Sequence, residues 1–208
     1  MKIIRLGKND IEKKKVTRSL YESCFPYDSK ELVDYYYDSL IKRNEIYIIE
    51  ENNKIISMIH LNPYLYYVSG KIVTIHYLFA IATDNAYRKR GYMKLLLNET
   101  IEYLKSINEP FCYLQPEDLN LENIYEKFGF FVLCNYTFDK FSNDSYDVFP
   151  VRDSEFIKLM EKEQYFLSKD PPEYIKTLRQ RKIMVRVLDD NIDIEKLKQK
   201  KAYFCNEI

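Results

Sequence analysis

A basic turn near the middle of the chain has the residue types needed to bind phosphate. Residues 83–91 read TDNAYRKRG and join an apolar run to the start of a helical pattern. A helix N-terminus offers backbone N–H groups and a positive dipole end to an anion, and glycine allows close approach. Arginine adds charge-assisted hydrogen bonds to phosphate. The turn therefore indicates a pyrophosphate site or, if it binds nothing, an exposed basic loop that contains a turn glycine.

Other classes of phosphate-binding protein fit the sequence less well. Neither G-x-x-x-x-G-K-[ST] nor G-x-G-x-x-G occurs, which disfavours nucleotide hydrolysis and a dinucleotide-binding fold. Lys+Arg and Asp+Glu both number 32, so the net charge gives no general attraction to nucleic acid or to an anionic membrane. We expect no nucleic-acid or membrane partner.

The cysteines and the apolar segments indicate a cytosolic protein. The four cysteines are widely spaced and the chain has two histidines, so we expect no metal site and reduced, mostly buried thiols. No window approaches the about 18 apolar residues of a membrane span, and the first ten residues do not resemble a signal peptide. A cytoplasmic location is the expectation.

The elements on either side of the basic turn predict an α/β domain with a mixed sheet. A long strand is expected over Ile72–Thr83. Apolar positions then recur every three or four residues, which predicts a helix from Gly91 to about Asn108. A strand (Phe111–Leu114), a helix (Leu119–Phe128) and a strand (Phe130–Phe138) complete a βαβαβ pattern.

Before the long strand, the pattern predicts a short strand, two helices and three strand-like runs. The expected elements are a strand at Ile3–Leu6, a helix over Asp10–Ser23, a second helix opened by Asp28 with Glu31 as its capping partner, and runs at Ile46–Glu50, Ile55–Leu61 and Leu65–Val68. The last run leads through Gly70 into the long strand. The run Lys13-Lys14-Lys15 is interpreted as the solvated face of the first helix.

The last third of the chain has a different pattern and is expected to form an appendage. The elements expected there are a helix over Asp153–Leu167, a break at Pro171-Pro172, a strand over Lys182–Leu188 and a helix over Ile192–Lys201.

Two segments together resemble the GNAT superfamily of acetyl-CoA-dependent N-acetyltransferases. The family signature Q/R-x-x-G-x-G/A reads Arg88-Lys89-Arg90-Gly91-Tyr92-Met93 here, with Met93 where Gly or Ala is usual. Downstream, Ile124–Phe130 is similar to the Y-x-x-F/L-G-F segment of the family. The resemblance implies a GNAT-like mixed, mostly antiparallel central sheet flanked by helices over residues 1–140, with residues 141–208 as a small C-terminal α+β appendage.

Within the superfamily, the sequence resembles most the branch that contains the enhanced intracellular survival proteins. A larger apolar residue is common there at the position of Met93. Lys182–Asp189 resembles the opening strand of the last domain of those longer proteins, so this chain looks like a shortened relative. In the longer proteins the C-terminal carboxylate approaches the active site, which would be Ile208 here.

The resemblance implies transfer of the acetyl group from acetyl-CoA to a primary amine by direct attack. Tyr125 would be the general acid that protonates the leaving thiolate. The residues implied in binding acetyl-CoA are Ile81, Ala82 and Thr83 at the strand end, and Arg88, Lys89, Arg90, Gly91, Tyr92 and Met93 in the turn. The base that deprotonates the amine is left open among His76, Glu117 and Asp118.

The identity of the acceptor and two other functions also remain open. The acceptor is expected to be a small-molecule or lysine-type amine, and a homo-oligomer is one outcome for the assembly. A member of the same fold that binds acyl-CoA without catalysis is one alternative. A protein-interaction module is another, with an aromatic surface made of Tyr35, Tyr36, Tyr37, Tyr64, Tyr66 and Tyr67.

Overall fold

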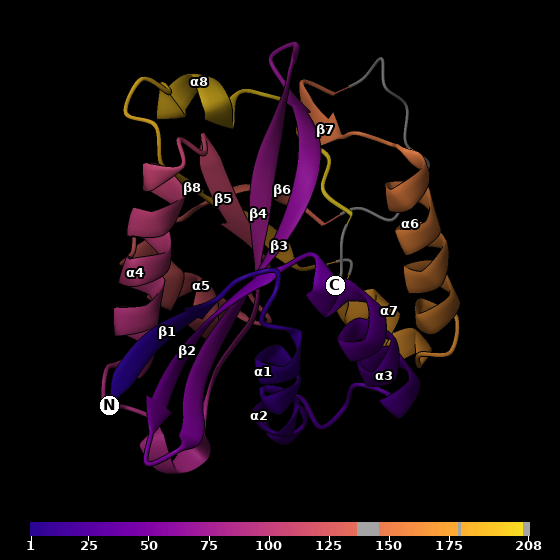
Figure 1. Ribbon diagram of the computed structural model, residues 1–208. Helices are drawn as coiled ribbons and strands as arrows, with labels where there is room; N and C mark the ends of the chain where they lie inside the picture. Colours follow the sequence, from indigo (N-terminus) through magenta and orange to yellow (C-terminus); the bar gives the residue numbers. More distant parts are fainter. Residues whose placement is uncertain (137–145, 179, 206–208) are drawn as a thin grey trace. The chain divides into compact units, whose positions relative to one another are not determined.

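Eight strands form one hydrogen-bonded sheet in the computed structural model, which describes residues 1–136, 146–178 and 180–205. They are β1 (Lys2–Leu6), β2 (Glu45–Glu51), β3 (Lys54–Val68), β4 (Lys71–Thr83), β5 (Phe111–Leu114), β6 (Phe131–Asn135), β7 (Val148–Pro150) and β8 (Lys182–Val187). The strand order is β1-β2-β3-β4-β5-β8-β6, and β7 pairs with β3. With its flanking helices this is the expected mixed, mostly antiparallel α/β fold (Figure 1).

The chain divides into two compact units. The first contains residues 1–63 and 77–107, and the second contains residues 64–76 and 108–208. β3 and β4 contribute residues to both units. The helices of the first unit are α1 (Ile11–Val16), α2 (Arg18–Cys24), α3 (Lys30–Ser39) and α4 (Tyr92–Ser106), and those of the second are α5 (Leu119–Glu126), α6 (Ser154–Leu167), α7 (Pro172–Leu178) and α8 (Ile194–Lys198).

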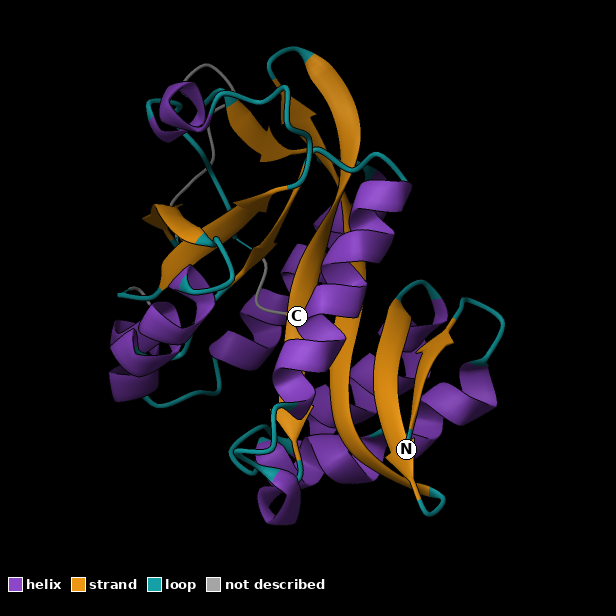
Figure 2. Cartoon of the chain, turned by 90° about the vertical axis from the view of Figure 1, so that its left-hand side faces the viewer, coloured by secondary structure: helices purple, strands orange, loops and turns teal. Residues whose placement is uncertain are grey.

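In the first unit, β1, β2 and the start of β3 lie side by side as an antiparallel sheet (Figure 2). Ile46, Ile48 and Ile49 of β2 are fully buried, so this strand lies in the core. Asn52 and Asn53 have φ angles of 51° and 61° in the β2–β3 turn, which is the conformation that a two-residue hairpin needs. The predicted hairpin is therefore confirmed.

Three predicted boundaries in this unit were wrong. The first helix is two helices, because Thr17 separates α1 from α2 and its hydroxyl bonds to the carbonyl of Lys14 at 2.6 Å. Ser29, not Asp28, caps α3 by accepting from the N–H of Leu32, while Asp28 accepts from the hydroxyl of Tyr21 at 2.6 Å. The two runs expected on either side of Pro63 form one strand, β3.

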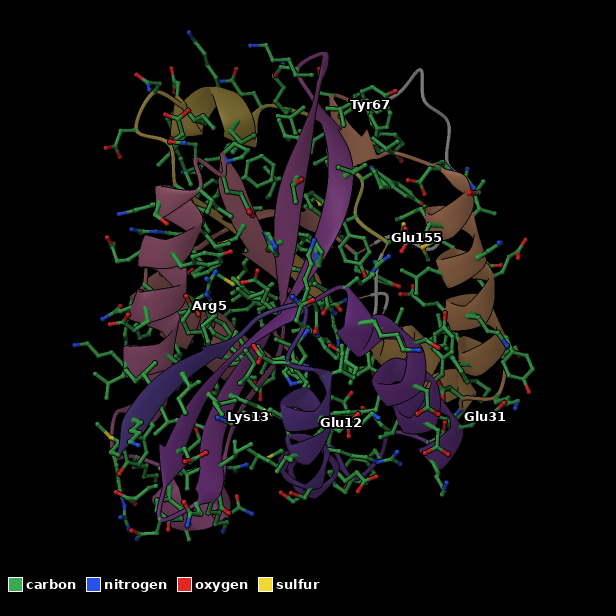
Figure 3. All side chains as sticks on the ribbon, in the orientation of Figure 1. Arg5, Glu12, Lys13, Glu31, Tyr67 and Glu155 are labelled. Carbon is green, nitrogen blue, oxygen red and sulfur yellow. The ribbon has the colours of Figure 1, made fainter. Side chains whose placement is uncertain are left out.

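Lys14 is buried, which corrects the interpretation of the lysine run as a solvated face. Lys13, which Figure 3 labels, is exposed on α1, and so is Lys15, whereas the side chain of Lys14 is inaccessible to solvent. Its ammonium group donates to the carbonyls of Ile41 and Asn44, at 2.8 and 2.5 Å. Burial lowers the pKa of Lys14 to about 8. One lysine of the run is therefore a buried residue that fixes the backbone of the segment after α3.

The predicted aromatic surface is largely absent. Tyr36, Tyr37, Tyr64 and Tyr66 are each at most 4% exposed, and only Tyr35 and Tyr67 are partly accessible. The buried tyrosines pack in the cores of the two units instead. The 15% aromatic content of the sequence therefore reflects core packing more than a binding surface.

In the second unit, β8 lies between β5 and β6 and is antiparallel to both. Its residues Ile183, Met184 and Val185 are fully buried. This strand was expected in an appendage but belongs to the same sheet as the strands before residue 140. The boundary at 140/141 lies in residues 137–145, outside the described residues, so the division into two domains stays a prediction.

The residues that follow α8 are part of the core of the second unit. Phe204 is fully buried, with its ring centroid 5.0 Å from that of Tyr66 and 4.7 Å from that of Tyr113. Cys205 is also buried, and its carbonyl accepts from the hydroxyl of Tyr136 at 3.1 Å. Ile208 lies outside the described residues, so the expectation about the terminal carboxylate stays a prediction. Two elements of this unit, β7 and α7, were not predicted.

Candidate functional site

The long strand β4 is interrupted just before its last three residues. Ala80 has a φ of 48°, in the left-handed region that residues with a Cβ rarely occupy. Such a conformation inside a strand costs about 1–2 kcal/mol and changes the direction of the backbone, as a β-bulge does. The interruption therefore sets Ile81, Ala82 and Thr83 apart from the regular part of β4. Sequence reasoning missed Ala80 because nothing in its residue type signals this conformation.

Side chains from β3 hold the end of β4. The hydroxyl of Ser57 bonds to the carbonyl of Ala82 at 2.8 Å and to the hydroxyl of Thr83 at 2.8 Å. The N–H of Asp84 donates to the carbonyl of Ile56 at 2.9 Å. These contacts fix the point at which the chain leaves the sheet and enters the basic turn.

The basic turn is ordered by its own side chains. Asp84 caps the short 3₁₀ helix Asn85–Tyr87 and accepts from the ammonium of Lys54 at 2.6 Å. Hydrogen bonding to Lys54 lowers the pKa of Asp84 below its usual value, so this carboxylate stays ionised. Lys89 then takes a φ of 63°, and the chain reverses into α4. The predicted turn between strand and helix is confirmed.

The two arginines of the turn lie on its exposed side and bond to its backbone. Nε of Arg88 donates to the carbonyl of Thr83 at 3.1 Å, and Nη2 of Arg90 donates to the carbonyl of Ala86 at 3.0 Å. The guanidinium of Arg90 also lies 5.3 Å from the ring centroid of Tyr87. Since a guanidinium has five N–H donors, one such bond leaves most of them available to an anion. Both side chains therefore order the loop and keep positive charge at its surface.

Gly91 opens α4 without a side-chain cap. Its φ is 83°, and the first bond of the helix runs from the N–H of Leu95 to its carbonyl at 3.1 Å. The N–H groups of Tyr92 and Met93 precede this bond and have no acceptor within the helix. A Cβ placed on Gly91 would meet nothing within 4 Å. The helix N-terminus is thus open and positively polarised, as an anion site requires.

Tyr125 is fixed in the second unit by the turn that ends α5. Its carbonyl accepts from the N–H of Phe128 at 2.9 Å and from that of Phe130 at 3.2 Å. Its ring packs edge-on against Phe130, with centroids 6.0 Å apart, and the residue is 6% exposed. Burial raises the pKa of Tyr125 well above its usual value, so the hydroxyl keeps its proton.

Comparison with known proteins identifies the family. Residues 5–133, more than half of the chain, match the sequence profile described as an acetyltransferase (GNAT) domain. The chain belongs to the GNAT acetyltransferases. The curated proteins contain no match.

Solved structures agree with the GNAT fold. Aminoglycoside 6′-acetyltransferase type Ii is 13% identical with a TM-score of 0.59, and the match covers 92% of this chain and 100% of that one. Ribosomal-protein-S18-alanine N-acetyltransferase from Escherichia coli is 15% identical with a TM-score of 0.55, covering 92% and 98%. At these identities the likeness shows the fold alone.

A third structure is much longer than this chain. It is a protein of unknown function from Enterococcus faecalis V583, described as a probable N-acyltransferase, with 16% identity and a TM-score of 0.55. The match covers 64% of this GNAT chain and 33% of that one, so the similarity spans about a third of the longer protein.

The three candidates for the base have different surroundings in this GNAT structure. Asp118 caps α5 by accepting from the N–H of Leu121 at 2.8 Å, and Glu117 is exposed. His76 is buried against Glu109, whose carboxylate accepts from the backbone N–H of His76 at 2.6 Å and lies 2.5 Å from its Nδ1. Sequence reasoning missed Glu109, because a glutamate before a proline looks like an ordinary surface turn.

The predicted cofactor residues are brought together by one unit of this GNAT protein. Residues 81–83 and 88–93 lie along one strand end, turn and helix start in the first unit, whereas Tyr125, His76, Glu117 and Asp118 belong to the second. The four cysteines are free thiols, and two of them, Cys112 and Cys205, are buried. Within the described ranges, no group of three His, Cys, Asp or Glu side chains could hold a metal, and no helix could span a membrane.

Proposed function

We propose that this protein is an N-acetyltransferase that moves the acetyl group from acetyl-CoA to a primary amine by direct attack. The observation that carries the proposal is the uncapped start of α4. Unpaired N–H groups, open space at Gly91 and two exposed guanidinium groups meet there. A pyrophosphate supplies the negative charge and the acceptor oxygens that this arrangement lacks.

The proposal gives the named residues separate roles. Arg88, Lys89 and Arg90, with the backbone of residues 91–93, hold the pyrophosphate, and the backbone of residues 81–83 binds the pantetheine arm and the thioester carbonyl. The amine nitrogen bonds to the acetyl carbon while the carbon–sulfur bond breaks, and the proton that the nitrogen loses passes to a base, which stays open among His76, Glu117 and Asp118. Tyr125 gives its proton to the departing thiolate. Burial favours the protonated hydroxyl, which supports this role.

Calorimetry with acetyl-CoA tests the cofactor site. The double variant Arg88→Ala, Arg90→Ala should lose about 1.5–3 kcal/mol of binding free energy for each charge-assisted contact removed. Lys105→Ala is the matched control, because it removes a positive charge at the other end of α4. It should bind as the wild type does. Absence of acetyl-CoA binding by the wild type would refute the proposed function.

A thiol-release assay tests Tyr125. Tyr125→Phe should lower kcat by about 10²–10⁴ with little change in KM for acetyl-CoA, because the ring is kept and only the proton donor is lost. Tyr113→Phe removes another buried hydroxyl of the same unit and is the control. An unchanged kcat in Tyr125→Phe would remove Tyr125 from the mechanism. No thiol release with any amine, in a protein that binds acetyl-CoA, would favour the non-catalytic alternative.

The finer expectations belong to the same proposal. We propose a small-molecule or lysine-type amine as the acceptor, membership near the enhanced intracellular survival branch, and a cytoplasmic location, which the four free thiols support. A panel of a polyamine, an aminoglycoside and a lysine peptide in the thiol-release assay would identify the acceptor class. Light scattering would measure whether the protein forms a homo-oligomer.

A further inference from the structure

The guanidinium of Arg186 occupies the place where any other residue at position 129 would have its side chain. Gly129 has a φ of 76°, and a Cβ built on it would lie 1.6 Å from Nη1 of Arg186. The same Cβ would lie 2.8 Å from Cζ of Arg186. Both residues belong to the second unit. The guanidinium therefore lies directly against the bare backbone of Gly129.

The position of Arg186 is fixed by the sheet. It stands on β8 opposite Cys112 of β5, and the preceding residue, Val185, stands opposite Phe131 of β6. Because both neighbouring strands hold β8 in register, the backbone of Arg186 has little freedom. Its side chain lies against Gly129.

This guanidinium is not placed by an acid. Within residues 1–136, 146–178 and 180–205, Nε of Arg186 is buried without a hydrogen-bond partner, and none of the ion pairs there includes Arg186. A buried guanidinium nitrogen without a hydrogen bond is costly, so another interaction must offset that cost. Gly129 follows the last residue of α5, Glu126, by three positions. A cation there is favoured by the negative end of the helix dipole.

The contact reaches Tyr125 through a short turn. The N–H of Gly129 donates to the carbonyl of Glu126 at 2.9 Å, and the next N–H, that of Phe130, donates to the carbonyl of Tyr125 at 3.2 Å. The ring of Phe130 also packs on the ring of Tyr125. A shift of Gly129 would therefore move the N–H group and the ring of Phe130, which both contact Tyr125.

We propose that Arg186 is a positioning residue for Tyr125, acting through the turn at Gly129. This inference rests on the proposed function, because it assigns Arg186 to the proton-transfer step of that reaction. Arg186 covers the turn from β8, and it sets the direction of the Tyr125 hydroxyl without touching the reacting atoms. The strand predicted to belong to an appendage would thus serve the catalytic residue.

A double-mutant cycle on kcat tests the proposal. Arg186→Ala should lower kcat by about tenfold or more in the wild-type background, with KM for acetyl-CoA changed less than about twofold. In the Tyr125→Phe background the same substitution should change kcat by less than about twofold, because residues that act as a unit are non-additive. Arg186→Lys, which keeps the cation, should recover most of the lost rate.

Arg181→Ala is the matched control in both backgrounds. Arg181 directly precedes β8, has a buried Nε as Arg186 does, and lies 5.6 Å from the ring centroid of Tyr174. Its removal should leave kcat within about twofold. Equal loss of kcat from Arg186→Ala in both backgrounds, or no loss in either, would overturn the proposal, since a general structural defect does not depend on Tyr125.

A stability cycle tests the contact even if the wild type transfers no acetyl group. Gly129→Ala should lower the thermal midpoint strongly, and adding Arg186→Ala should recover part of that loss because the clash is removed. Additive losses would show that Arg186 does not press on Gly129, and would overturn the proposal independently of catalysis. Inactivity of the wild type with every amine would instead refute the proposed function while leaving the contact measurable.

Discussion

Gly91 and Gly129 have nearly the same φ angle and opposite surroundings. Their φ angles are 83° and 76°, and each stands at the end of a helix within one of the two motif segments. A Cβ on Gly91 would meet nothing within 4 Å, whereas a Cβ on Gly129 would meet a guanidinium at 1.6 Å. Glycine therefore leaves open space at position 91, whereas at position 129 the side chain of Arg186 fills that space.

The two turns also differ in how they treat charge. At Gly91 the arginines are exposed and bond to backbone carbonyls, so positive charge faces the solvent. At Gly129 the one guanidinium lies against the backbone of a turn that holds a buried tyrosine. The first arrangement suits recognition of a charged molecule. The second suits fixing one hydroxyl group.

The largest expected effect is on the closed turn. Gly129→Ala should lower the free energy of unfolding by about 2–5 kcal/mol, since a left-handed residue costs about 1–2 kcal/mol and a forced fit adds about 1–3. Denaturant unfolding measures this value. A loss under about 1 kcal/mol would show that Arg186 moves away freely, and the contrast between the two glycines would disappear.

A smaller loss of stability is expected at the open turn. Gly91→Ala should cost about 1–2 kcal/mol of unfolding free energy, because only the left-handed conformation opposes the new methyl group. The methyl group should weaken binding of acetyl-CoA by about tenfold, since it enters the space over the N–H groups of α4. Calorimetry measures this affinity. Tight binding by Gly91→Ala would show that the open space is not where the pyrophosphate lies.

Ala80 provides a third left-handed position, and the expected effect there is smaller again. Ala80→Gly removes strain of about 1–2 kcal/mol but gives the unfolded chain more freedom, worth about 0.5–1 kcal/mol. The variant should therefore be more stable by up to about 1.5 kcal/mol in thermal unfolding. A destabilised variant would mean that the methyl group of Ala80 packs productively and that the strain is small.

The smallest change is expected in the pH profile. Burial raises the pKa of Tyr125, so the protonated form, and with it the acid function, is lost only as the pH rises through that raised value. The ratio of kcat between wild type and Tyr125→Phe should thus stay constant from pH 7.5 to about 9.5. A ratio that falls toward one near the usual tyrosine pKa of about 10 would show that the closed turn opens in solution.

The sequence was sufficient for the parts of the fold that depend on local pattern. The apolar period after Gly91 predicted α4, and the helix expected from Asp153 is α6 with Asp153 as its cap. The strand, basic turn and helix were placed correctly, because their signals lie within about ten residues of one another. The roles given to residues 81–83, to 88–93 and to Tyr125 stay predictions that the experiments above address.

The remaining features depend on contacts between distant parts of the chain. The pairing of β8 with β5 joins residues about 70 positions apart, which no local pattern encodes. Glu109 meets His76 across 33 positions, and Lys14 meets Asn44 across 30. In both of these contacts the charged residue is buried, although the local sequence suggested an exposed one, because its partner is distant in the sequence. Ala80 shows a different limit, since a strained φ on an ordinary residue type leaves no trace in the sequence.

The position of β8 has a consequence for synthesis of the protein. Among the described strands, β6 pairs with β8 alone, so residues 131–135 await residues 182–187 before they can form that pairing. Because long-range pairing must wait for loop closure, the segment around Tyr125 and β6 is expected to assemble late. Until then its apolar residues are exposed to chaperones and to other nascent chains.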